Sequence, residues 1–226
     1  NIAIGGNAFV GLTTAAGNTG ANNIALGYQA GHKVTTAHRN ILIGCNAGSS
    51  IEHTGQCNIF MGIDAGKANT EGTQNSAIGY AAGCHLTTGS YNAFYGNCAG
   101  RGVTSSNYNT AVGPSALYST TNTGAGQVAL GYKALCEATA ANYTVAVGPQ
   151  AGKEVTTSEE SVFIGYYSAG AGAANLTGNN HTVIGNRAGL YLQGSAACNT
   201  LLGNYAGCNI TTGSCNVVIG NKALAA

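Results

Sequence analysis

A nearly constant repeat period limits the folds open to this chain. The segment NIALGYQAG, residues 23–31, recurs in variant form from one end of the sequence to the other. Aligned on a central glycine, the copies lie 17 or 18 residues apart, except for two steps of 22 and 20 residues. A short regular period is typical of a solenoid, in which each repeat forms one coil. The central glycines are Gly5, Gly27, Gly44, Gly62, Gly79, Gly96, Gly113, Gly131, Gly148, Gly165, Gly185, Gly203 and Gly220.

Each repeat predicts a short strand just before its central glycine. The positions one and three residues before the glycine hold mostly bulky or β-branched residues, such as Ile41 and Ile43, which suit a pleated surface. We expect these two columns to face the core, since alternate residues of a strand share a face. A high glycine content of 36 residues disfavours helices. The sequence therefore predicts an all-β chain, a parallel β-solenoid of about thirteen coils of 17 or 18 residues, with residues 1–226 as a single domain.

The position between these two columns is apolar in every repeat. Strand alternation points it away from the expected core, and soluble monomers avoid an unbroken exposed apolar stripe. We therefore expect another copy of the chain to cover this face. The alternative is that both faces of each strand are buried within one chain. The larger residues of the expected inter-chain face are Leu42, Phe60, Phe94, Phe163, Val183, Leu201 and Val218.

A polar column accompanies each strand, four residues before the central glycine. Asparagine occupies it in most repeats, and Gln127, Thr144, Ser161 and His181 occupy it in the others. Stacked asparagine side chains can bond to the copies in the coils above and below. The column predicts an asparagine ladder along the solenoid.

Charge is scarce, with 8 basic and 7 acidic residues and a net charge of +1. The basic residues form no cluster, so we expect no nucleic-acid partner. No apolar run reaches the length of a membrane-spanning helix, so we expect no membrane insertion. The chain opens inside a repeat at Asn1 and closes soon after the last one, at Ala226. Since solenoid ends need caps, we expect a segment of a longer fibre or a unit capped by neighbours.

We predict no catalytic, cofactor or metal site, and no enzyme activity. Only Glu159 and Glu160 are adjacent acids, and neighbouring side chains point apart rather than toward one substrate. No Cys-x-x-Cys pair occurs, which argues against zinc. We expect the histidines, which fall at different positions of the repeat, to be exposed on coil edges. They are His32, His38, His53, His85 and His181.

Cysteines and sequons offer candidate modification sites. Cys198 and Cys215 share one column in successive coils, within expected disulfide reach, and Cys208 competes for Cys215. The four Asn-x-Thr sequons matter only in a protein secreted from a glycosylating cell. They begin at Asn142, Asn175, Asn180 and Asn209.

Tyrosines form a further set, and several directly follow a central glycine, as Tyr28, Tyr80, Tyr132 and Tyr166 do. Exposed tyrosines among asparagine and threonine suit a surface that binds saccharides. They suit a contact between chains equally well, and we favour that interpretation.

The segments NIALGYQAG, NSAIGYAAG, TAVGPSALYSTTNTG and NITTGSCNVVIGNKAL resemble the repetitive shafts of bacteriophage and large-virus tail fibres. They are also similar to the head repeats of trimeric autotransporter adhesins. The resemblance covers essentially the whole chain. It implies a β-roll in which three parallel chains pack together and project a receptor-binding tip.

We therefore expect a structural fibre of a virion or cell surface that supports attachment to a host or surface, without catalysis. Its expected partners are further copies of itself, as a trimer, and a surface glycan. One alternative is an extracellular filament subunit that polymerises end to end. A second alternative is a carbohydrate-active solenoid enzyme, which would need two carboxylates in one cleft.

Overall fold

The structure is a computed structural model that describes residues 1–11, 19–52, 54–170, 172 and 175–225. The chain divides into two compact units, Asn1–Asn109 and Thr110–Ala226. Each unit is a β-solenoid of parallel strands, and no helix occurs among the described residues. The predicted all-β solenoid with one short strand per repeat is confirmed. That the whole chain acts as a single domain stays a prediction.

Each strand covers the three residues before a central glycine, which is the position predicted for it. The strands of the first unit are β1 (Ile2–Ile4), β2 (Ile24–Leu26), β3 (Ile41–Ile43), β4 (Ile59–Met61), β5 (Ser76–Ile78) and β6 (Ala93–Tyr95). Those of the second unit are β7 (Thr110–Val112), β8 (Val128–Leu130), β9 (Val145–Val147), β10 (Val162–Ile164), β11 (Thr182–Ile184), β12 (Thr200–Leu202) and β13 (Val217–Ile219).

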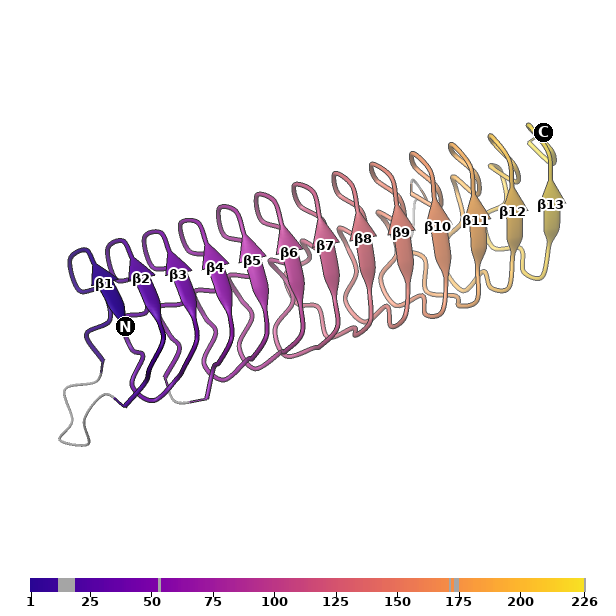
Figure 1. The fold of residues 1–226 in the computed structure, drawn as a ribbon. Helices are drawn as coiled ribbons and strands as arrows, with labels where there is room; N and C mark the ends of the chain where they lie inside the picture. Colours follow the sequence, from indigo (N-terminus) through magenta and orange to yellow (C-terminus); the bar gives the residue numbers. More distant parts are fainter. Residues whose placement is uncertain (12–18, 53, 171, 173–174, 226) are drawn as a thin grey trace. The chain divides into compact units, whose positions relative to one another are not determined.

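Within each unit a strand pairs in parallel with the strand one repeat later, and equivalent residues lie opposite each other. Ile41 faces Ile59 in the first unit, and Val145 faces Val162 in the second. Figure 1 shows the strands of each unit side by side, with a loop leading from each strand to the next. Coil-to-coil hydrogen bonds continue past the strands, as where the Gln29 amide donates to Gly6 O at 2.9 Å. Every repeat position therefore becomes a column along the solenoid.

Close approach of adjacent coils explains why the central residue is glycine. Gly79 has a φ of +136°, a region that side chains disfavour. A Cβ at this position would lie 2.4 Å from the carbonyl oxygen of Gly96 in the next coil. Backbone meets backbone at this corner, so a larger residue has no room.

The structure reverses the predicted faces of the strands. The middle residue of each strand points into the chain's own core, and only in β1 is it exposed. The first and third residues point outward and are half-buried or exposed. The prediction that the middle column forms an inter-chain face is therefore wrong. Its named members, Leu42, Phe60, Phe94, Phe163, Val183, Leu201 and Val218, are all buried within one chain.

Packing against the corner glycines is the physical reason for this reversal. Phe60 lies so close to the glycine corner of its coil that a Cβ on Gly66 would come within 2.4 Å of its ring. Phe94 lies equally close to Gly100. The rings fill the space that these glycines leave, which places the middle column inside the coil.

The predicted asparagine ladder is confirmed in the first unit. Asn58 Oδ1 accepts hydrogen bonds from the backbone amide of Asn75 at 2.9 Å and from its Nδ2 at 3.2 Å. Asn75 Nδ2 also donates to Gly89 O at 2.9 Å. The pattern repeats from Asn23 to Asn92, so these buried amides are satisfied by the coils on either side.

In the second unit a buried histidine joins the ladder. His181 Nε2 lies 2.8 Å from Ala196 O, and the Asn199 amide lies 3.4 Å from Nδ1. Since Nδ1 accepts, the fitting tautomer is neutral with its hydrogen on Nε2. Burial lowers the pKa of His181, although the carbonyls of Ala196 and Gly178 act in the opposite direction. The prediction that this histidine is exposed is wrong, and His53 lies outside the described residues.

Candidate functional site

The outward side of the strands is an unusual surface. We call it the outer strand face and define it as the first and third residues of β1–β6 in the first unit and of β7–β13 in the second. No charged residue occurs in it, and its polar side chains besides Tyr95 are Ser76, Thr110, Thr182 and Thr200. The remaining positions are aliphatic, apart from Tyr95. Each unit therefore presents an apolar strip that runs across all of its strands.

Large side chains of this face are open to solvent in the single chain. Ile78 is 37% exposed and Leu202 is 44% exposed, although each belongs to a strand with a neighbouring strand on both sides. The hydroxyl of Tyr95 donates to Ser76 Oγ at 3.0 Å, which ties two neighbouring strands together on this face. Such a strip is larger than scattered surface residues and is typical of an interaction site.

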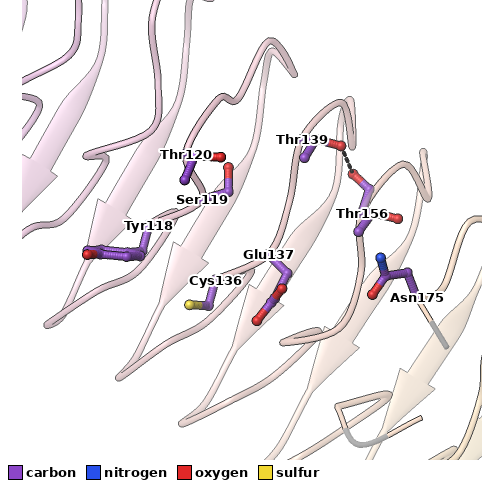
Figure 2. Close-up of a pocket in the computed structure, with 8 residues that line it drawn as sticks. All are labelled: Tyr118, Ser119, Thr120, Cys136, Glu137, Thr139, Thr156 and Asn175. Carbon is purple, nitrogen blue, oxygen red and sulfur yellow. Dashed lines mark hydrogen bonds between the residues drawn. The ribbon is translucent and has the colours of Figure 1, made fainter. Parts of the chain in front are cut away.

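Away from the strands, the second unit has a shallow hollow of about 330 Å³. Figure 2 shows Tyr118, Cys136 and Glu137 along one side, with Thr139 and Thr156 joined by a hydrogen bond. The Ser119 hydroxyl donates to Ala138 O at 2.5 Å, so it is held by a backbone carbonyl. Burial raises the pKa of the Cys136 thiol, which disfavours the thiolate needed for nucleophilic chemistry. The lining contains one carboxylate, that of Glu137.

A second hollow, of about 460 Å³, lies on the loops that follow β10, β11 and β12. Its lining consists of four tyrosines, one leucine and one arginine. Arg187 Nη1 donates to the hydroxyl of Tyr205, and its Cζ lies 5.8 Å from the Tyr166 ring centroid. The lining residues are Tyr166, Tyr167, Arg187, Leu190, Tyr191 and Tyr205. We call this set the tyrosine–arginine hollow.

The acidic residues are dispersed, and several are engaged with neighbouring side chains. Glu159 Oε1 accepts from Asn142 Nδ2 at 2.6 Å, and Glu154 pairs with Lys153 at 2.6 Å. Glu160 is exposed beside Glu159 and has a φ of +52°. Neither hollow contains a pair of carboxylates of the kind that glycoside hydrolysis uses.

All eight cysteines are free thiols in the structure. Cys198 and Cys215 are exposed at equivalent positions of adjacent coils, whereas Cys208 is 6% exposed. A bond between Cys198 and Cys215 stays a prediction, and burial of Cys208 makes it the less suitable partner.

The four sequon asparagines differ in surroundings. Asn175, Asn180 and Asn209 are exposed, whereas Asn142 is partly buried. Asn142 also accepts from the Ala125 amide at 2.9 Å through Oδ1, so both ends of its side-chain amide are engaged. Glycosylation stays a prediction, and Asn142 is the sequon least suited to it.

Within the described ranges no group of three or more metal-ligating side chains gathers, and no helix has the length and apolarity to cross a membrane. No protein-family model matches the chain, and neither a curated protein nor a solved structure matches it.

Proposed function

We propose that the chain is a structural fibre protein whose outer strand face packs against the same face of other copies. The observation that carries the proposal is the uncharged apolar strip that each unit presents on its strands. Burying this strip between copies would remove it from water, which is the main driving force of protein association. Its lack of charged residues fits an interface core, where charges are depleted.

The period of the strip supports a second copy as its occupant. Equivalent residues recur once per strand, at the spacing of about 4.8 Å that parallel strands adopt. A partner that follows the strip over six or seven strands must present features at the same spacing. Another copy of this solenoid meets that condition in each coil, whereas a helix or a globular surface does not.

The size of the strip is also suitable. A three-residue strand covers about 10 Å by about 4.8 Å, so the strip of each unit has a projected area of roughly 300 Å². A stable interface buries about 800 Å² on each partner. The strips of both units are needed to approach that value. We therefore expect the chains to associate along their whole length, as in a shaft.

Three copies are the number that the resemblance to trimeric fibre shafts implies. A repetitive chain with few charged residues and no catalysis suits a spacer on a virion or cell surface, where it would hold an attachment domain away from its base. This assignment of location and role rests on the resemblance and on the outer strand face together.

Sedimentation of the full chain tests the proposal. We would compare the wild type with Ile43→Lys/Val147→Lys, which adds one charge to the outer strand face of each unit. The matched control is Asn97→Lys/Asn186→Lys, which adds the same charge at exposed positions directly after central glycines. We expect the wild type and the control to sediment as a defined oligomer, and the outer-face variant to sediment as one chain with unchanged β-sheet circular dichroism.

Other results would contradict the proposal. A wild type that sediments as one chain at all concentrations would do so, and so would an oligomer that the outer-face charges leave intact. Species that keep growing with concentration in both variants would favour the end-to-end filament.

A further inference from the structure

We propose that the tyrosine–arginine hollow binds a saccharide that carries a carboxylate. The hollow offers aromatic faces for the apolar side of a sugar ring and a guanidinium for its acid group. The inference does not depend on the oligomer, because all lining residues come from one unit of one chain.

Repeat geometry gathers these residues from distant parts of the sequence. Tyr167, Arg187 and Tyr205 each stand two residues after a central glycine, so they form one column through three successive coils. The Arg187 amide donates to Tyr166 O and the Tyr205 amide donates to Asn186 O, so backbone hydrogen bonds align the three coils. Tyr191 approaches from the loop after β11 and completes the wall.

Arg187 has a charge that no acid neutralises among the described residues. The ion pairs found there are Lys33–Glu52, Lys67–Asp64 and Lys153–Glu154, and none includes this arginine. Its guanidinium instead meets the hydroxyl of Tyr205 and the rings of Tyr166 and Tyr205.

This arrangement leaves donors available for a ligand. A guanidinium has five N–H donors, so hydrogen bonds to the hydroxyls of Tyr205 and Tyr166 still leave a pair for a carboxylate. Cation–π contacts with two rings hold its plane in place.

The rings provide the second half of the site. Tyr166 is 40% exposed and Tyr191 is 44% exposed, and Tyr166 meets Tyr167 edge to face at 4.7 Å between centroids. Exposed tyrosine faces beside a polar rim suit a ligand that is apolar on one side and hydroxylated on the other, as a pyranose is.

The charged residues near the central glycines of the second unit also fit an anionic ligand. In the second unit the two positions after each central glycine hold no acidic residue, and they include Lys133 and Lys222 besides Arg187. The charged residues at these two positions are therefore all basic, although the chain as a whole is nearly neutral.

Saturation-transfer NMR and titration calorimetry on the full chain test the site. The acidic probes are 3′-sialyllactose and tetragalacturonate. Their neutral counterparts are lactose and the methyl ester of tetragalacturonate, which keep the sugar rings and lack the free carboxylate. We expect one or both acidic probes to bind at least about tenfold more tightly than its counterpart, and the two arms distinguish a sialic acid from a uronic acid.

Variants locate the binding. Arg187→Gln should lower the affinity for the acidic probe about tenfold or more, because hydrogen bonds between charged groups are stronger than neutral ones. Lys133→Gln removes the same charge from the same column two coils before the hollow and should leave binding unchanged. Tyr191→Ala should weaken acidic and neutral probes alike, since it removes a stacking face.

Three results would overturn the inference. They are failure of the wild type to bind either acidic probe, equal binding of acidic and neutral forms, and equal effects of Arg187→Gln and Lys133→Gln. Sedimentation of each variant shows separately whether association between chains is retained, so a failure here is distinguishable from a failure of the proposed fibre.

Discussion

Removing one amide from the asparagine ladder should destabilise the first unit strongly. Asn75→Ala deletes the two bonds that Nδ2 donates, to Asn58 Oδ1 and Gly89 O, and the two that Oδ1 accepts from Asn92. The Asn58 oxygen keeps the Asn75 backbone amide, and Asn92 Nδ2 keeps Ser106 O. The groups that lose their partner are therefore the Gly89 carbonyl and the Asn92 backbone amide.

The cost follows from these two orphaned groups. Leaving a buried donor or acceptor unsatisfied costs about 1 to 3 kcal/mol, so we expect a loss of roughly 2 to 6 kcal/mol in the free energy of unfolding. Urea denaturation followed by circular dichroism measures it. The control is Asn97→Ala, since this asparagine is exposed and its change should cost less than about 0.5 kcal/mol. A loss below about 1 kcal/mol for Asn75→Ala would refute the ladder as a source of stability.

Three further changes test other parts of the fold. Gly79→Ala should lower the free energy of unfolding, measured by thermal denaturation, by about 3 kcal/mol or more, because the new Cβ would overlap the Gly96 backbone. Gly6→Ala is the control and should have a mild effect, because the atom nearest to its Cβ would be 3.4 Å away. Asn69→Leu should raise the free energy of unfolding by about 1 to 3 kcal/mol, because both polar atoms of this buried side chain lack a hydrogen-bond partner among the described residues; a loss in urea denaturation would contradict this. Because burial lowers the pKa of His181 from its ordinary value of 6.5, the unfolded chain binds more protons just below that pH, so stability is full above pH 6.5 and falls as the pH drops toward the folded pKa. His181→Asn should remove that part of the pH dependence, and equal pH profiles for the two proteins would count against it.

The sequence located the strands but assigned their faces wrongly. Repeat period and β-branched columns predict where each three-residue strand lies, and the structure agrees for all thirteen strands found among the described residues. The faces are misassigned because the outward columns hold mostly bulky or β-branched residues, whereas the inward column, although apolar throughout, contains many alanines. Side-chain bulk identifies the core side of a strand only when the other side meets water, and we propose that here the outward side meets another chain.

A volume pattern could have identified the inward column. Where a strand and the next one both have alanine in the middle, the residue four after the first strand's central glycine can be large. Leu117 follows the strand of Ala111 in this way, and Leu135 follows the strand of Ala129. Both leucines are fully buried, so they fill the space that the alanines leave. Compensating sizes of this kind show that the two columns share one core.

The candidate sites were less accessible to sequence reasoning. The tyrosines are recognisable as a set in the sequence, but grouping residues by type does not place Arg187 in one column with Tyr167 and Tyr205. The signal was their shared place two residues after a central glycine. The hollow also needs Tyr191, whose position depends on the path of a loop rather than on the repeat.

Cryo-electron microscopy of the assembled protein tests the central claim most directly, because it counts the chains in each cross-section and identifies the residues at which they meet. We predict several solenoids, three by the resemblance, that meet through the outer strand face, with Ile43 and Val147 buried between chains. A single solenoid with that face in solvent, or chains that meet through any other face, would contradict it.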